Sequence, residues 1–186
     1  MQRVRRRTAW RSIAAALAAT LALAAPAYAQ ADGQAAPSTA TGKTKPDPYP
    51  TMYEVFGQDS LENGKFMWKE GATEVDRVVL VLSDQMIFAY DKDEMVGVST
   101  VSTGRPGHET RPGSFKILAK HRYYYSKKYD NAPMPYMQQI TSYGVALHAG
   151  QLPGRPASHG CIRLPTQFAA NLFAVTQIGT PVVIEQ

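Results

Sequence analysis

Short apolar runs separated by turn residues dominate the chain from about residue 75 onward. The runs are rich in β-branched and aromatic residues, while Gly, Pro, Asp and Ser gather between them, which is typical of strands joined by turns. The predicted strands are residues 78–82, 86–90, 95–102, 114–118, 143–149 and 181–184. Only Ser83-Asp84-Gln85 separates the first two runs, so we expect them to form a hairpin. The pattern predicts a mostly β domain arranged as a sandwich or a curled sheet.

One segment near the end of the chain changes to helical spacing. Its apolar positions after Pro165 share one helix face: Phe168, Leu172, Phe173 and Val175. This spacing predicts one short amphipathic helix before the last strand. Residues 53–71 are ambiguous, and we expect either a short helix or a loop that packs on the domain through its aromatic residues, Phe56, Phe66 and Trp68.

Residues 121–139 hold the highest density of aromatic residues in the chain. The segment also contains Pro133 and Pro135, and we expect it to be too long and irregular for a hairpin turn. Long loops inside compact domains are usually lids or binding loops. The alternative is a surface excursion that covers part of the core.

The first 29 residues have the pattern of a secretory signal peptide. Five arginines precede an apolar stretch at residues 13–25, and Ala27-Tyr28-Ala29 fits a cleavage site before Gln30. The apolar stretch is too short to cross a bilayer of roughly 30 Å as a helix. We therefore expect export to the periplasm or cell envelope with no membrane span left after cleavage. An uncleaved anchor is the alternative.

Charge and composition distinguish the first 29 residues from the rest of the chain, and a linker from a domain within that rest. The whole chain has 20 Lys and Arg against 15 Asp and Glu, and residues 1–29 hold five of the arginines and no acid, which leaves 15 against 15. The basic balance belongs to the leader and gives no reason to expect a nucleic-acid partner. Residues 30–52 are rich in Ala, Thr, Gly and Pro and are predicted to be a flexible linker. Residues 53–186 are predicted to form one domain with its core at about 75–185.

Cys161 is the only cysteine in the chain and lies close to histidines in sequence. A single thiol cannot form an internal disulfide, and an imidazole beside it can take its proton to give a nucleophilic thiolate. His148 lies near the end of a predicted strand and is favoured over His159 as the partner, because the intervening loop lets the chain turn back. The alternatives are an inert buried thiol and a zinc site, which lacks a fourth ligand.

Two neighbours of Cys161 fit the chemistry of acyl transfer. Gly160 lets the backbone approach closely, so that N–H groups can face a developing oxyanion. Arg163 is a fixed cation that can hold a substrate carboxylate or brace the loop. His108 and His121 are expected to have no catalytic role.

The segment Ser158-His159-Gly160-Cys161-Ile162-Arg163 resembles the signature of the L,D-transpeptidase catalytic domain family, also called YkuD-like. Ala146-Leu147-His148-Ala149-Gly150 resembles the upstream histidine segment of that family, and Thr110-Arg111-Pro112-Gly113-Ser114-Phe115 resembles its strand-entry pattern. The resemblance covers about residues 75–184. It implies a β sandwich of mixed sheets with one or two short helices and with the cysteine in a groove.

The same resemblance implies the roles of individual residues. Cys161 would be the nucleophile, His148 the proton donor and acceptor, and the carbonyl of Ala149 the third member of the triad. His159 and Gly160 would line the oxyanion site with Cys161, supported by Ser158 and Arg163. The segment Pro133-Met134-Pro135-Tyr136-Met137 resembles the preceding loop, so Tyr136 and Met137 are candidates for substrate contact. No metal and no cofactor is expected.

The implied substrate is a tetrapeptide stem of peptidoglycan. Cys161 would attack the carbonyl of the third residue and expel the terminal D-alanine, and an amine of a second stem would accept the acyl group to give a 3→3 cross-link. If water accepts it, the protein is an L,D-carboxypeptidase. If a lysine accepts it, an envelope protein becomes attached to peptidoglycan. The alternative outside enzymes is a catalytically silent wall-binding module of the same fold.

Overall fold

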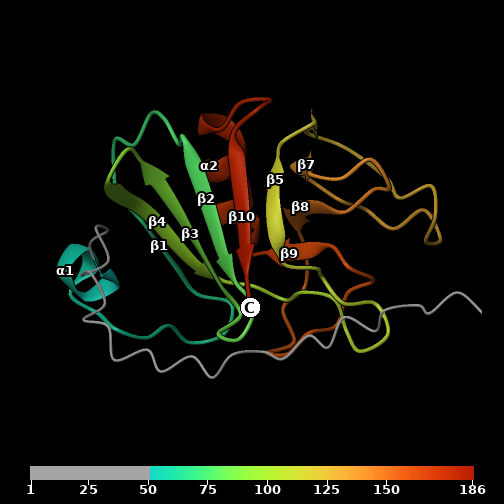
Figure 1. Ribbon diagram of the computed structural model, residues 1–186, viewed down its shortest axis with the longest axis horizontal. Helices are drawn as coiled ribbons and strands as arrows, with labels where there is room; N and C mark the ends of the chain where they lie inside the picture. The colour runs from blue at the N-terminus through green and yellow to red at the C-terminus, as the bar shows by residue number, and fades with distance from the viewer. Residues whose placement is uncertain (1–50) are drawn as a thin grey trace, which may run out of the picture. The chain divides into compact units, whose positions relative to one another are not determined.

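Two β-sheets organise residues 51–186, the part of the chain that this computed structural model describes (Figure 1). The predicted signal peptide and nearly all of the predicted linker lie outside the described residues. The larger sheet has six strands in the order β1-β4-β3-β2-β10-β5, and the smaller has four in the order β6-β7-β8-β9. The larger sheet contains β1 (Phe66–Trp68), β2 (Arg77–Val81), β3 (Met86–Asp91), β4 (Glu94–Thr100), β5 (Gly113–Lys116) and β10 (Pro181–Glu185). The smaller contains β6 (Ala119–His121), β7 (Met137–Gln139), β8 (Ala146–Ala149) and β9 (Ile162–Leu164).

The larger sheet is built on the predicted hairpin. β2, β3 and β4 pair antiparallel in sequence order, and the two tight turns use residues with positive φ, Gln85 at 52° and Lys92 at 54°. The C-terminal strand β10 then pairs in parallel with β2 and antiparallel with β5. This confirms the predicted hairpin and places the C-terminal strand between β2 and the edge strand β5.

The smaller sheet is also mixed. β6, β7 and β8 pair antiparallel, and β9 runs parallel to β8. With two mixed sheets and two short helices among the described residues, the predicted fold class is confirmed. The predicted strand at residues 143–149 is shorter than expected, because Tyr143 and Gly144 belong to the turn that precedes β8.

The main core lies between the sheets, where helix α2 (Thr166–Val175) packs. Alternate residues of the central strands point into it, among them Val78, Leu80 and Ile87, as the two-residue period of a strand requires. The ring of Phe168 packs edge-on against Trp68 at 5.4 Å between centroids. Since α2 also contacts β8, the predicted helix fixes the larger sheet against the strand that carries His148.

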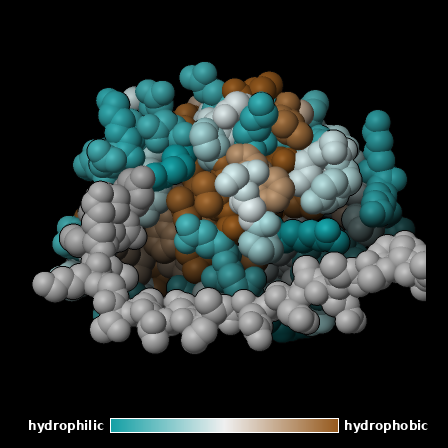
Figure 2. All heavy atoms as spheres, in the orientation of Figure 1, coloured by the Kyte–Doolittle hydropathy of each residue, from teal (hydrophilic) through white to brown (hydrophobic). Residues whose placement is uncertain are grey.

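The other face of the larger sheet carries a second apolar cluster around Tyr90, Met95 and Val98. Helix α1 (Met52–Phe56) packs on this cluster and begins with a capping box between Thr51 and Glu54. Figure 2 shows hydrophobic residues gathered over the larger sheet, with hydrophilic residues around them. The ambiguous segment 53–71 therefore contains both a short helix and the edge strand β1.

Residues 122–136 form a long antiparallel hairpin that continues β6 and β7, which we call the arm. Backbone bonds join Tyr136 N to Arg122 O at 2.9 Å, Met134 N to Tyr124 O at 2.8 Å and Ser126 N to Ala132 O at 2.9 Å. The tip turns through Asp130 and Asn131, both with positive φ. The segment is thus longer than a hairpin turn, and its two sides pair although the sequence shows no hydrophobic alternation, because pairing depends on backbone groups.

No helix among residues 51–186 is both long and apolar enough to cross a membrane.

Candidate active site

Cys161 stands immediately before β9, at the end of a turn held by one side chain. The hydroxyl of Ser158 donates to the carbonyl oxygen of Cys161 at 2.5 Å and accepts from the N–H of Gly160 at 3.0 Å. Gly160 has a φ of 108°, a conformation that L side chains rarely adopt. The Ser158-His159-Gly160-Cys161 sequence thus folds as a locked turn that presents the thiol.

The segment that follows β4 holds this turn in place through hydrogen bonds of Ser102 and Thr103. Ser102 and Arg163 exchange two backbone hydrogen bonds at 3.1 and 3.0 Å, and the N–H of Ser158 donates to Thr103 O at 3.0 Å. The hydroxyl of Ser102 also donates to Arg155 O at 2.7 Å. The loop that carries Cys161 is therefore tied at Arg155, Ser158 and Arg163 to the segment that follows β4.

His148 lies on β8, buried with 7% of its surface exposed. Its Nδ1 lies 2.8 Å from the carbonyl oxygen of Ala149. A carbonyl only accepts, so Nδ1 carries the proton and Nε2 is left as the basic nitrogen. In the parallel register His148 pairs with Arg163, and side chains two residues apart on a strand share a face. Cys161 and His148 therefore lie on the same face of neighbouring segments.

Burial favours the neutral forms of both His148 and Cys161. Burial lowers the pKa of His148, opposed by its bond to Ala149 and reinforced by the charge of Arg163. Burial also raises the pKa of Cys161, partly offset by the N–H of Ala146 and by Arg163. The thiol donates to Gly144 O with Sγ at 3.7 Å. Both shifts favour a thiol and a neutral imidazole over a thiolate and an imidazolium.

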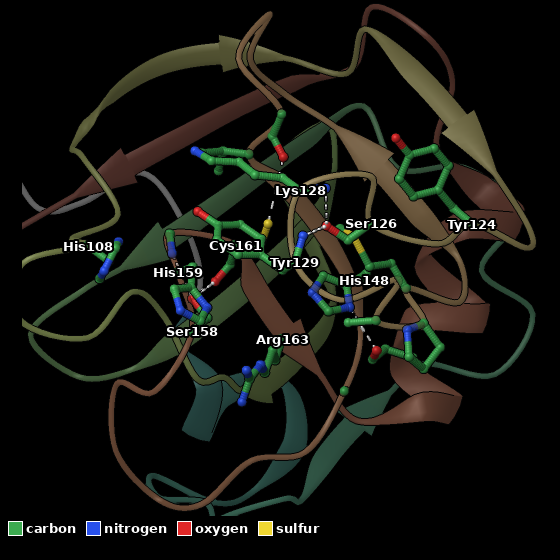
Figure 3. Close-up of a pocket in the computed structure, with 18 of the residues that line it drawn as sticks. His108, Tyr124, Ser126, Lys128, Tyr129, His148, Ser158, His159, Cys161 and Arg163 are labelled. Carbon is green, nitrogen blue, oxygen red and sulfur yellow. Dashed lines mark hydrogen bonds between the residues drawn. The ribbon is translucent and has the colours of Figure 1, made fainter.

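A cavity of about 970 Å³ opens over Cys161 and His148. In Figure 3, His159 and His108 lie on one side of Cys161 and His148 on the other. The arm forms part of the wall, and the ring of Tyr129 stacks on His159 at 4.3 Å with 20° between the planes. His159 in turn meets His108 edge-on at 4.9 Å. Three rings therefore join the tip of the arm to the loop that carries Cys161.

The charged residues of the cavity wall are mainly basic. Arg111, Lys127, Lys128 and Arg163 line it against the single carboxylate of Glu109. Such a wall favours ligands that carry carboxylates. Within residues 51–186, no three His, Cys, Asp or Glu side chains come together as a metal site.

Residues 75–184 match the family described as YkuD, L,D-transpeptidase catalytic domain. The chain belongs to this family. The resemblance found in the sequence is therefore confirmed, and the L,D-transpeptidase domain occupies more than half of the chain. The comparison with curated protein sequences gives no match.

Solved structures of L,D-transpeptidases share this fold. One from Mycobacterium tuberculosis is 26% identical with a TM-score of 0.56, covering 59% of this chain and 57% of that one. One from Stackebrandtia nassauensis is 27% identical with a TM-score of 0.56, covering 63% and 58%. L,D-transpeptidase 3 from Mycobacterium tuberculosis, in complex with a faropenem-derived adduct, is 25% identical with a TM-score of 0.54, covering 59% and 59%. The match spans less than two thirds of the length of these structures.

The L,D-transpeptidase domain brings together most of the residues singled out in the sequence. The cavity lining includes His148, Ala149, Ser158, His159, Gly160, Cys161 and Arg163. Tyr136 and Met137 are not part of it. Met137 packs beneath Cys161 in a small apolar cluster, and the ring of Tyr136 faces Phe173 of α2.

Other residues of the lining were not indicated by the sequence. His108 was expected to have no catalytic role, yet it lines the cavity beside His159. Tyr129 was one of several tyrosines in the aromatic segment, and only the fold shows which of them reaches the loop that carries Cys161. The signal that pointed to this wall was the concentration of aromatic residues before β7, which favoured a lid or binding loop.

Proposed function

We propose that the domain is a cysteine L,D-transpeptidase that acts on peptidoglycan stem peptides. It cleaves the bond before the terminal D-alanine of a tetrapeptide donor through a thioester on Cys161, and transfers the acyl group to an amine of a second stem. The observation that carries this proposal is a cavity within the family-matched domain. It is lined by both Cys161 and the buried His148, whose Nε2 is free to act as a base. The predicted signal at residues 1–29 supports action in the periplasm or cell envelope.

The first half-reaction transfers one proton and exchanges one bond. The thiol turns from Gly144 O toward Nε2 of His148, which takes its proton as Sγ bonds to the substrate carbonyl carbon. The carbonyl oxygen then carries the negative charge. When this intermediate collapses, the C–N bond breaks, and the imidazolium gives its proton to the departing D-alanine amine. A thioester and a neutral His148 remain.

The second half-reaction repeats these steps in reverse with another amine. The acceptor attacks the thioester carbon, His148 removes a proton from the acceptor nitrogen, and the C–S bond breaks. The imidazolium then returns the proton to Sγ. The carbonyl of Ala149 holds His148 in one tautomer throughout, the role that a carboxylate has in a serine protease triad. The basic wall of the cavity favours the carboxylates of the stem peptides.

Product analysis tests the proposal. Residues 30–186 are incubated with a purified tetrapeptide muropeptide, and free D-alanine and the products are measured by mass spectrometry. We expect release of D-alanine and a cross-linked dimer of two muropeptides, and we expect Cys161→Ala to give neither. A trimmed tripeptide alone indicates an L,D-carboxypeptidase. Equal product from wild type and Cys161→Ala contradicts the proposal, as does labelling of a protein acceptor with no dimer.

A further inference from the structure

The N–H groups near Cys161 are unequally available to a substrate. The N–H of Gly160 already donates to the hydroxyl of Ser158 at 3.0 Å. It serves the turn and is not free to bind a developing oxyanion. The next N–H along the chain belongs to Cys161 itself, and its direction is set by the peptide unit that it shares with Gly160.

A buried threonine on a distant loop holds that peptide unit. Thr110 is 5% exposed, and its hydroxyl donates to the carbonyl oxygen of Gly160 at 2.9 Å. The hydroxyl oxygen of Thr110 also accepts from the N–H of Gly104 at 2.9 Å. The hydroxyl thus bridges two backbone groups, and its single proton is committed to Gly160.

The path of the loop explains how Thr110 reaches this position. Residues 104–110 fold back on themselves so tightly that a Cβ on Gly104 would lie 2.0 Å from His108 O and 2.7 Å from Thr110 N. Gly104 also bridges Ser158 in a parallel pairing. The loop is therefore fixed against the nucleophile turn at both of its ends.

The direction of the Cys161 N–H follows from peptide geometry. The C=O of Gly160 and the N–H of Cys161 belong to one planar unit, and in a trans peptide they point in opposite directions. No peptide among the described residues is cis. Because Thr110 holds the carbonyl on one side of this unit, the N–H points away from Thr110. Cys161 lines the cavity, and we infer that its N–H faces that cavity.

We propose that Thr110 is a positioning residue for acyl transfer. It contacts neither substrate nor thiol. By holding Gly160 O, it aims the N–H of Cys161 at the oxygen that becomes negatively charged when Sγ attacks a carbonyl carbon. Oxyanion stabilisation depends on donors that are oriented before the reaction. This inference rests on the proposed acyl chemistry at Cys161, but not on the identity of the peptide substrate.

Two reactions of the same thiol separate this role from a purely structural one. Faropenem, a β-lactam, acylates a thiol: the S–C bond forms, the carbonyl oxygen becomes an oxyanion, the ring C–N bond breaks and the nitrogen takes the proton. Iodoacetamide alkylates it: the S–C bond forms as iodide leaves, and the thiol proton passes to the imidazole or to water. Only the first reaction forms an oxyanion.

The experiment compares Thr110→Val, which keeps the shape without the hydroxyl, with Thr110→Ser, which keeps the hydroxyl. Modification of Cys161 is followed by intact mass for both reagents. We expect Thr110→Val to slow acylation by faropenem about 10- to 100-fold, as for a weakened oxyanion donor, and to change alkylation less than about 2-fold. Thr110→Ser should keep both rates near wild type. If Thr110→Val does not fold, Thr110→Ala replaces it.

Three results would overturn the proposal. One is an equal fall in both rates, which means that the thiol itself has been disturbed. Another is unchanged acylation in the variant without a hydroxyl. The last is a wild-type protein that iodoacetamide alkylates and faropenem does not acylate. Acylation by faropenem without release of D-alanine from a muropeptide would contradict the proposed peptide substrate and would not affect the proposed role of Thr110.

Discussion

His148 on β8 lies directly opposite Arg163 on β9 in the parallel register of the smaller sheet. Their side chains share a face, and the charge of Arg163 adds to burial in lowering the pKa of His148. The same charge opposes the burial that raises the pKa of Cys161. Arg163 therefore favours the neutral form of His148 and the ionised form of Cys161.

Replacement of Arg163 by Gln should move the acid limb of the pH–rate profile. A lowered pKa keeps His148 neutral below its ordinary value of 6.5, so the rate should fall only as the pH drops through that lowered value. Without the cation the pKa rises, and the limb should shift to higher pH. The measurement is the rate of D-alanine release between pH 4 and 9. Arg163→Lys keeps the charge and should leave the limb in place, and a limb that Arg163→Gln does not move contradicts this role.

Removal of the Tyr129 ring should free the tip of the arm. An aromatic pair contributes about 0.5–1.5 kcal/mol, so loss of the stack on His159 should raise the open population roughly 2- to 10-fold. Trypsin cuts after Lys127 and Lys128 at the tip, and cleavage of a rapidly opening segment follows the open population. We expect Tyr129→Ala to be cut faster by that factor.

Two variants serve as controls for the arm. Tyr129→Phe keeps the ring and should be cut at the wild-type rate. Tyr123→Ala removes a tyrosine that is 80% exposed and should also have no effect. Cleavage that is equal in Tyr129→Ala and wild type would mean that the stack does not hold the arm.

The sequence predicted the parts of the fold whose pattern is local. The runs that form β2 and β3 are long enough to show strand character, and the turn between them is short, so their pairing followed directly. β6, β7 and β9 have three residues each, too few for a two-residue period to stand out. The pairing within the arm was not predicted, because it runs through backbone groups, while its tyrosines and prolines follow no alternation.

The same distinction applies to the candidate site. Cys161 and His148 were found because the lone thiol, the glycine beside it and the nearby strand end all lie within a short stretch of sequence. The bond from Thr110 to Gly160 joins residues 50 positions apart, and no local pattern predicts it. The pKa shifts of His148 and Cys161 also depend on burial, which is a property of the folded chain.

Lys120 should stabilise the C-terminus of α2. Its ammonium donates to Phe173 O at 2.7 Å and to Thr176 O, and it lies 4.6 Å from the ring centroid of Phe173. A cation at this end of a helix also opposes the helix dipole. We expect Lys120→Met to lower the free energy of unfolding by about 2 kcal/mol, measured by urea denaturation. Lys116→Met, at an exposed position of β5, should change it by less than about 0.5 kcal/mol. Equal effects of the two variants contradict the assignment.

Gly97 on β4 should accept no side chain, because two rings of the core cover it. A Cβ there would lie 2.5 Å from Trp68 and 3.3 Å from Phe168. Overpacking of this kind costs about 1–3 kcal/mol, so Gly97→Ala should lower the free energy of unfolding by that amount. Replacing the indole of Trp68 by the smaller side chain of leucine, in Trp68→Leu, makes room for the new methyl group. The double variant should then be more stable than the sum of the two single effects predicts, by at least about 0.5 kcal/mol. Additive effects in urea denaturation would show that the clash with Trp68 is not the cause.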